Sequence, residues 1–366
     1  MICPHCEKNL LRKERTGNTC SHCHRRYALD PKTNPLALND LRIRRVVHRI
    51  TDEGRISVST GQLWYALSRK RITEAEFGSG SLGVTCGVGL FVGFLGIVAE
   101  LVPLLYVSGF LLVAVGGILA ARWAGIGKGI PPVTHELFRK DALGEWQRVY
   151  GGLPPGVVDD TGDPWRATAQ ALASAPASAP ATGRTAVLLC SDRSVATFLA
   201  ANAVPFRHGI PLVRDPRDLR KLPAGLPVLV LHDADAEGEL LVHRLRDELP
   251  GRRVVDAGLP LRTLRPLPGG VPYRDPARKP GAEEMRRLRE LGTVTPEELD
   301  RLAKGWRFPL VAVPPSKLLD VVTRFAEEAG RKTDSERRRA AAVGFMTWPG
   351  TGTADGSAAA AGGGAR

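Results

Sequence analysis

Two long apolar runs dominate the pattern of hydrophobic and polar positions along the chain. They cover residues 82–99 and 104–121, contain no charged side chain, and are separated by the short break 100–103. Each run is close to the roughly 20 residues that an α-helix needs to cross the hydrocarbon core of a bilayer. The pattern therefore predicts a two-helix transmembrane hairpin over residues 82–121, which would anchor the protein in the lipid bilayer.

Basic residues flank this predicted hairpin on both sides. Residues 69–71 are Arg-Lys-Arg, Arg122 and Lys128 follow the second run, and Glu100 is the single charge in the break. Because Lys and Arg concentrate on the cytoplasmic side of membrane proteins, the flanks predict a two-pass protein of the cell membrane. Both termini are expected in the cytoplasm.

A different pattern begins downstream, between residues 184 and 330. Short apolar segments at 185–190, 226–232 and 252–258 alternate with amphipathic segments of helical spacing. Such alternation favours an α/β domain with a parallel sheet and right-handed crossovers. The part after residue 274 is mostly helical in pattern, so helical additions to this domain are expected.

The remaining segments are assigned from periodicity and composition. Residues 36–77 predict a small helical juxtamembrane unit, and residues 134–158 an amphipathic helix with a connector. Residues 159–183, rich in Ala, Pro and Ser, predict a disordered linker, and residues 335–366 a disordered tail. With a cysteine-rich segment at 1–30, the fold class is multidomain.

The overall charge points to an acidic partner. The formal net charge is +13 over 366 residues, which suits anionic lipid or nucleic acid. The abundance of Ala, Gly, Pro and Arg equally fits the compositional bias of a GC-rich genome, so charge alone leaves the partner open.

Four cysteines form two pairs near the N-terminus. Cys3 and Cys6 are separated by two residues, as are Cys20 and Cys23, with thirteen residues between the pairs. Four thiolates close a tetrahedral shell around Zn²⁺ and leave no open position for water or substrate. The spacing predicts a structural zinc ribbon over residues 1–30, and cysteine pairs of this kind suit a reducing cytosol.

Several basic side chains lie close to the cysteine pairs in the sequence. They suit a phosphate backbone and equally suit lipid headgroups or a protein contact. No aromatic residues interleave with them, which favours lipid proximity or protein contact over specific reading of nucleic acid. These residues are Arg12, Lys13, Arg15, Arg25 and Arg26.

A second candidate site follows the apolar segment 226–232. Asp233 and Asp235 are two residues apart, so their side chains point the same way in an extended backbone. Carboxylates at the carboxyl end of a parallel strand suit Mg²⁺, and Glu237 adds charge where the next helix begins. The sequence therefore predicts a Mg²⁺ site at Asp233, Asp235 and Glu237. The alternative is that these residues only cap the following helix.

The stretch DADAEGE, from Asp233 to Glu239, resembles the DxDxEGE motif of Toprim domains. Toprim domains occur in type IA topoisomerases, in primases and in topoisomerase VI and its meiotic relatives. The resemblance covers about residues 184–260. It implies that the two Asp hold Mg²⁺ for phosphoryl transfer on DNA or RNA.

The first strand departs from the Toprim pattern. Toprim enzymes carry a Glu at the end of that strand, whereas this chain has Cys190 or Ser191 there. Asp192 lies close enough to substitute in a shifted register, so the candidate catalytic residues are Asp192, Asp233 and Asp235. No tyrosine has an evident nucleophile context, and cleavage through a tyrosyl intermediate is unsupported.

These observations leave alternative functions open. The first is a membrane-anchored cytoplasmic protein whose zinc ribbon and Mg²⁺-binding Toprim-like domain bind nucleic acid or act on it. If the protein is an enzyme, it catalyses Mg²⁺-dependent phosphoryl transfer or nucleic-acid hydrolysis. The second is a non-enzymatic membrane adaptor that docks cytoplasmic protein partners, which the missing first-strand Glu favours. A third is a DNA-binding regulator using residues 36–72 as a helix-turn-helix-like unit.

Overall fold

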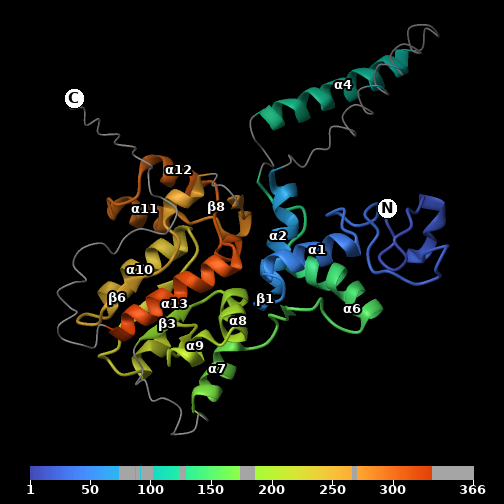
Figure 1. The fold of residues 1–366 in the computed structure, drawn as a ribbon. Coiled ribbons are helices and arrows are strands. Elements are labelled where there is room, and N and C mark those ends of the chain that lie inside the picture. Colours follow the sequence, from blue (N-terminus) through green and yellow to red (C-terminus); the bar gives the residue numbers. More distant parts are fainter. Residues whose placement is uncertain are drawn as a thin grey trace, which may run out of the picture.

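The fold is seen in a computed structural model (Figure 1). The predicted disordered tail at 335–366 lies outside the residues that the structure describes, as do 74–77 of the juxtamembrane unit and 174–183 of the predicted linker. The described residues are 1–73, 87, 91, 102–123, 129–173, 186–265 and 270–331.

A parallel four-stranded sheet forms the centre of the C-terminal half, which confirms the parallel α/β architecture expected there. Its order is β4-β3-β5-β6. The two central strands pair in register from Val187↔Val228 to Cys190↔Leu231, and both are buried along their whole length, as strands covered on both faces should be. The strands are β3 (Val187–Cys190), β4 (Leu212–Val213), β5 (Val228–Leu231) and β6 (Val254–Asp256).

Alternate side chains of the central strands enter two separate cores. Val187 and Val230 join a smaller core with Leu245 of α10 (Ala236–Glu248), while Leu188 and Leu231 join the main core. This two-residue period is the direct consequence of the strand pleat. The helices around the sheet also include α7 (Pro164–Ala173), α8 (Arg193–Ala201) and α9 (Val204–Arg207).

The C-terminal additions are helical apart from one short strand pair. Strands β7 (Tyr273–Arg274) and β8 (Trp306–Arg307) run antiparallel, and α11 packs beside α10. The helices are α11 (Ala282–Glu290), α12 (Pro296–Ala303) and α13 (Pro315–Arg331). Short 3₁₀ turns lie at Arg12–Glu14, Thr16–Asn18, Pro216–Lys221, Leu261–Leu264, Pro276–Arg278 and Leu310–Ala312.

The N-terminal helical unit is built from two segments that are distant in sequence. Strands β1 (Val58–Ser59) and β2 (Val157–Val158) pair in parallel, which brings the two segments together. The first segment contributes α1 (Asp40–Ile50) and α2 (Thr60–Thr73). The second contributes α5 (His135–Leu137), the π-helix η3 (Phe138–Leu143) and α6 (Gly144–Tyr150).

One hydrophobic core continues from this helical unit into the α/β unit. It includes Leu38, Leu63, Phe138, Leu188 and Leu318. A polar contact reinforces the junction, because the Tyr65 hydroxyl both donates to the carbonyl of Val271 and accepts from its N–H, each at 2.7 Å. The described parts of the segments 36–77, 134–158 and 184–330 therefore pack together along one continuous core.

Part of the predicted disordered linker is ordered. Residues 164–173 form α7, which packs against α8. The buried Trp165 side chain holds this helix in place, since its indole N–H donates to the carbonyl of Cys190 at 3.0 Å. The Ala-, Pro- and Ser-rich composition of this segment is typical of a linker and does not predict a helix. The helix is held by the contact of one buried Trp with a distant residue, which composition does not reveal.

The predicted transmembrane hairpin requires correction. Within the described residues, no helix is both long and apolar enough to cross a membrane. The first run, 82–99, lies outside them except for Gly87 and Phe91, and the second falls in α4 (Val102–Trp123). The predicted two-pass topology and membrane localisation are therefore wrong on this finding, and the lipid partner stays a prediction.

Candidate metal centre and acidic crevice

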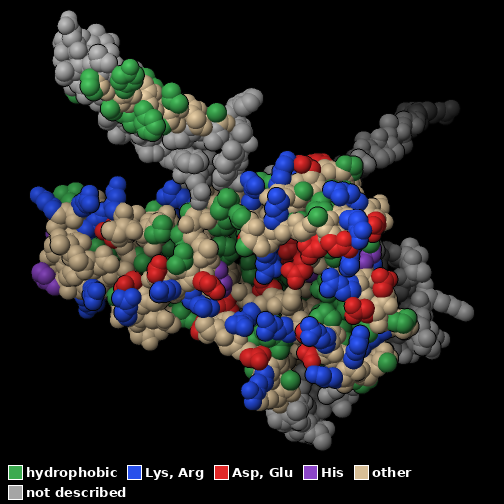
Figure 2. Space-filling view, turned by 180° about the vertical axis from the view of Figure 1, so that it is seen from behind, with side chains coloured by type: hydrophobic (Ala, Val, Ile, Leu, Met, Phe, Trp, Pro, Cys, Tyr) green, Lys and Arg blue, Asp and Glu red, His purple; other side chains and the backbone are tan. Residues whose placement is uncertain are grey.

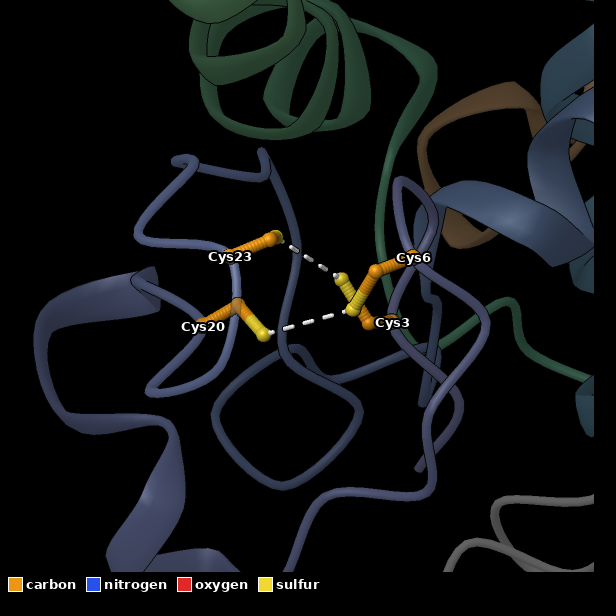
Figure 3. A group of neighbouring side chains, drawn as sticks. All are labelled: Cys3, Cys6, Cys20 and Cys23. Atoms are coloured by element: carbon orange, nitrogen blue, oxygen red, sulfur yellow. Dashed lines mark hydrogen bonds between the residues drawn. The ribbon is translucent and has the colours of Figure 1, made fainter.

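The four cysteines of the two pairs converge at one point (Figure 3). Their sulfur atoms all lie within 4.8 Å of one another. The Sγ atoms of Cys3 and Cys23 are 3.8 Å apart, as are those of Cys6 and Cys20. A tetrahedral zinc shell with Zn–S bonds of about 2.3 Å requires S–S separations of about 3.8 Å. The cluster can therefore hold a metal ion such as Zn²⁺ without rearrangement.

The two cysteine pairs sit in equivalent turns. An antiparallel bridge closes each turn, Ile2↔Asn9 around the first pair and Thr19↔Arg26 around the second. The residue after the second cysteine of each pair, Glu7 or His24, has a positive φ of 58° or 55°. This left-handed backbone is unusual for residues with a side chain. The same left-handed residue follows both cysteine pairs, and at each place it turns the backbone around the four cysteines.

The thiols differ in their tendency to ionise. Burial raises the pKa of Cys3 to about 11. Burial also opposes ionisation of Cys20, but hydrogen bonds from the backbone of Cys23 and His22 outweigh it and lower the pKa of Cys20 to about 7. Backbone N–H groups aimed at a sulfur atom favour the thiolate, which is the form that binds a metal.

Buried carboxylates tie this N-terminal lobe to the helices. Asp40, which is fully buried, accepts hydrogen bonds from the N–H groups of Ala28 and Leu29 and from the Tyr150 hydroxyl. Arg15 is also buried and pairs with a carboxylate, that of Asp30 at 3.0 Å. Of the five basic residues predicted to face a partner, Arg15 is therefore buried and structural, and the side chains of the other four are exposed.

The structure brings the predicted acidic residues to the carboxyl ends of neighbouring strands. Asp192 follows β3, and Asp233 and Asp235 follow β5, which pairs with β3. Asp192 caps α8 by accepting from the N–H of Val195 at 2.8 Å, and Asp235 caps α10 by accepting from the N–H of Gly238 at 2.8 Å. Capping, the alternative considered for this stretch, is therefore one of their roles.

Arg307 occupies the space between the two central carboxylates. Its guanidinium pairs with Asp233 in a buried ion pair and lies 3.2 Å from Asp235. The second oxygen of Asp233 accepts the N–H of Leu310 at 2.7 Å. A fixed cation from β8 therefore stands where a Mg²⁺ ion was expected.

Two further side chains lie around Arg307, and together with Asp192, Asp233 and Asp235 they form the group of residues that we call the acidic crevice. Asp275 lies 3.6 Å from the guanidinium, and the ring of Tyr273 stacks beside it at 5.9 Å. Burial raises the pKa of Tyr273, so its hydroxyl stays protonated. Glu237, predicted to join the metal ligands, is exposed and instead pairs with Arg278 at 3.3 Å.

Burial and neighbouring negative charges raise the pKa of two carboxylic acids in this crevice. Burial and the nearby Asp233 carboxylate raise the pKa of Asp192 to about 6, and the same two causes raise the pKa of Asp235 to about 6. Burial would lower the pKa of Arg307, but the surrounding carboxylates outweigh it and raise that pKa further. The guanidinium is therefore a permanent countercharge.

His232 is a packed residue of the sheet. Its ring contacts the Asp256 carboxylate at 3.0 Å and the Asp233 carbonyl at 2.7 Å. A Cβ atom at Gly238 or Gly258 would lie within 2.4 Å of the ring, so glycine is required at both positions. These contacts give His232 a structural role.

Two further observations limit the chemistry. In the part of the chain that the structure describes, the cysteines are the one cluster of three or more metal-ligating side chains close enough to share an ion. Arg307 and Leu310, which close the crevice, lie 74 and 77 residues from Asp233. No local motif links either residue to the acidic stretch, so neither could be predicted from the sequence.

Comparisons with known proteins add no assignment. No protein-family model, curated protein or solved structure matches the chain.

Proposed function

We propose that this chain is a non-enzymatic binding protein built on a Toprim-like core, with a zinc-stabilised N-terminal lobe. The observation that carries the proposal is the ion pair of Arg307 with Asp233 and Asp235. Phosphoryl transfer in Toprim-like sites needs open carboxylate oxygens for Mg²⁺. Here an arginine and a backbone N–H already use the oxygens of Asp233.

Displacing Arg307 by a metal ion would be costly. The side chain is 6% exposed and its Nε has no hydrogen-bond partner among the described residues. Releasing the guanidinium from its carboxylates would leave a buried charge unpaired, which typically costs several kcal/mol. Mg²⁺ also loses its hydration shell reluctantly. The resident ion pair therefore excludes the ion under ordinary conditions.

Calorimetric titration of the full chain with Mg²⁺ tests this proposal. Wild type should show no saturable binding up to about 10 mM Mg²⁺, because Arg307 holds the site. Arg307→Ala frees the carboxylates and should bind Mg²⁺ where wild type does not. Asp247→Asn, an exposed carboxylate elsewhere on α10, is the matched control. Saturable binding by wild type that Asp233→Asn abolishes would contradict the proposal, as would Mg²⁺-dependent cleavage of DNA or RNA.

The zinc assignment has its own test. Metal analysis of the purified chain should find about one Zn²⁺ per molecule, since four thiolates complete one tetrahedral shell. Cys20→Ser should lower this content strongly, whereas Cys190→Ser, which alters a buried cysteine of β3 far from the cluster, should leave it unchanged. Equal zinc in wild type and Cys20→Ser would exclude this site.

A nucleic acid is the second candidate partner, and the charge of the N-terminal lobe favours it. Residues 1–50 hold 11 Lys and Arg against 4 Asp and Glu, which is 7 of the 13 net positive charges. Two of the four acids, Asp30 and Asp40, are buried. Figure 2 shows Lys and Arg side chains spread over the surface of this lobe.

Salt-dependent binding would distinguish a nucleic-acid partner from a protein partner. Fluorescence anisotropy with a short labelled duplex should give an affinity that falls linearly with the logarithm of salt concentration. The Arg25→Ala, Arg26→Ala double variant should weaken binding and reduce that slope by about 2. Arg244→Ala, Arg253→Ala on the α/β unit is the charge-matched control. Absence of binding at low salt would eliminate this candidate.

A further inference from the structure

A pocket of about 330 Å³ opens beside the π-helix η3, away from both the cysteine cluster and the acidic crevice. One wall is the helix that runs through α5, η3 and α6, and the other is the chain that returns after α6 toward β2 and α7. The lining side chains that matter here are Glu136, Arg139, Lys140, Leu143, Leu153 and Asp159.

The helical wall is irregular at the pocket. Lining positions recur every three or four residues from Glu136 to Gln147, so they share one face of the helix. Midway along this face the helix widens into a π-turn over Phe138–Leu143. Such insertions are rare and occur often at functional sites. Their irregular backbone has to be maintained by surrounding contacts.

A buried network behind the pocket supplies those contacts. Asp160 is 2% exposed and accepts hydrogen bonds from the Thr60 hydroxyl at 2.5 Å and the Ser194 hydroxyl at 2.6 Å. The Arg139 guanidinium lies 3.6 Å and the His135 ring 3.5 Å from the same carboxylate. Arg139 is thus held in position at the pocket rather than extended into solvent.

The charges of the lining are balanced. Arg139 and Lys140 supply two positive charges, and Glu136 and Asp159 supply two negative ones. Among the described residues, neither Lys140 nor Glu136 forms an ion pair, so each has its charge available for a ligand. Leu153, which is partly exposed, adds an apolar surface. A ligand that matches this lining carries one charge of each sign next to a hydrocarbon group.

We propose that this pocket binds a free α-amino acid with an aliphatic side chain. The carboxylate lies at Lys140 and Arg139, the ammonium group lies at Glu136 and Asp159, and the side chain packs on Leu153. The volume is at the small end of ligand pockets, which suits a single amino acid. Binding here is independent of the function proposed above, since no residue of the cysteine cluster or the acidic crevice lines the pocket.

Gly144 allows the pocket to be blocked without disturbing its walls. It lies in the helical wall, and a Cβ added there would meet only the Arg139 carbonyl, at 3.9 Å. Its φ of −61° is helical, so replacing it with a residue of higher helix propensity should not harm the fold. Gly144→Leu therefore places a side chain in the pocket.

Calorimetric titration of the full chain with L-leucine tests the proposal. Saturable binding is expected, and two analogues that each lack one charge, isocaproate and isoamylamine, should bind at least about tenfold more weakly. Equal binding of isocaproate would show that the pocket is a simple anion site and would overturn the proposed ligand class. Absence of saturable binding for L-leucine, L-valine and L-methionine would overturn the site itself.

Variants then locate the binding. Gly144→Leu should abolish it, and Lys140→Ala should weaken it by about tenfold or more. Arg148→Ala removes a cation from the same helix that does not line the pocket, so it should bind as wild type does. If Gly144→Leu fails to fold, as judged by circular dichroism, Lys140→Ala and Gly144→Ala decide. L-Leucine binding that none of these variants changes would place the site elsewhere and contradict the proposal.

Discussion

Asp192 shows how one carboxylate can both order and strain its surroundings. It caps α8 through the N–H of Val195, yet burial and the repulsion of the nearby Asp233 carboxylate raise its pKa from 3.8 to about 6. The folded state therefore binds this proton more tightly than the unfolded chain does. The stabilising effect of that proton is fully present below about pH 4 and is lost as the pH rises through about 6.

Asp192→Asn should relieve this repulsion at neutral pH. Asn caps a helix as well as Asp does, so the variant keeps the hydrogen bond and loses the charge. Relative to wild type, its free energy of unfolding should increase by about 1 to 2 kcal/mol between pH 5 and pH 8. Urea denaturation at the two pH values measures this difference.

Asp215→Asn provides the matched control for this measurement. Asp215 also caps a short helix, by accepting the N–H of Arg217, but its side chain is 46% exposed. Because solvent screens its charge, this variant serves as the exposed comparison. A pH-independent difference between Asp192→Asn and wild type would mean that neither burial nor Asp233 raises the pKa of Asp192 in solution.

At the scale of secondary-structure elements, Asp160 connects the chain between β2 and α7 with the helices α2 and α8. Its carboxylate, in the chain between β2 and α7, receives hydrogen bonds from the Thr60 hydroxyl and the Gly61 N–H at the start of α2 and from the Ser194 hydroxyl in α8. The helical unit and the α/β unit are thus connected by a buried polar centre as well as by their shared hydrophobic core.

Asp160→Ala should destabilise the whole fold. Removal of the carboxylate leaves three buried donors without an acceptor, and each unsatisfied donor costs about 1 to 3 kcal/mol. We expect a loss of about 3 kcal/mol or more in the free energy of unfolding, measured by chemical denaturation. Asp159→Ala, which changes the exposed neighbour, should cost much less. Equal losses in the two variants would show that the buried network contributes nothing specific.

The elements that could be predicted from sequence are those with a strong local signal. The strands at Val187–Cys190 and Val228–Leu231 are continuous apolar segments, and both are central in the sheet. Helix α7 was missed because Trp165 anchors it through a distant contact with Cys190. The apolar runs at 82–99 and 104–121 were interpreted as a membrane hairpin, but no helix among the described residues is both long and apolar enough to cross a membrane.

For the whole molecule, sites made by neighbours in sequence could be predicted, and sites made by distant segments could not. The pairs Cys3–Cys6 and Cys20–Cys23 converge as their spacing indicates. Asp192, Asp233 and Asp235 also lie together, whereas Glu237 pairs with Arg278 instead, and Arg307 comes from a strand 74 residues further along the chain. No periodicity in the sequence marks it as the partner of Asp233, and this pairing is what argues against a metal-dependent enzyme.

Removal of the metal should unfold the N-terminal lobe and leave the α/β unit intact. The lobe has a small core of its own, made by Cys3, Leu10, Cys20 and Tyr27 with a few partly buried neighbours, and a core of that size cannot stabilise a fold without a metal. After chelation, hydrogen exchange measured by mass spectrometry should show loss of protection over residues 1–30.

The same experiment shows how far the effect spreads. Asp40 receives two N–H groups from the lobe, those of Ala28 and Leu29, so the start of α1 should lose part of its protection as well. Strands β3 and β5 should keep theirs, because their two cores do not include residues of the cysteine cluster. Addition of Zn²⁺ should restore the original pattern. Uniform loss of protection across the chain would mean that the lobe and the α/β unit fold as a single cooperative unit, and unchanged exchange would mean that the lobe does not depend on a metal.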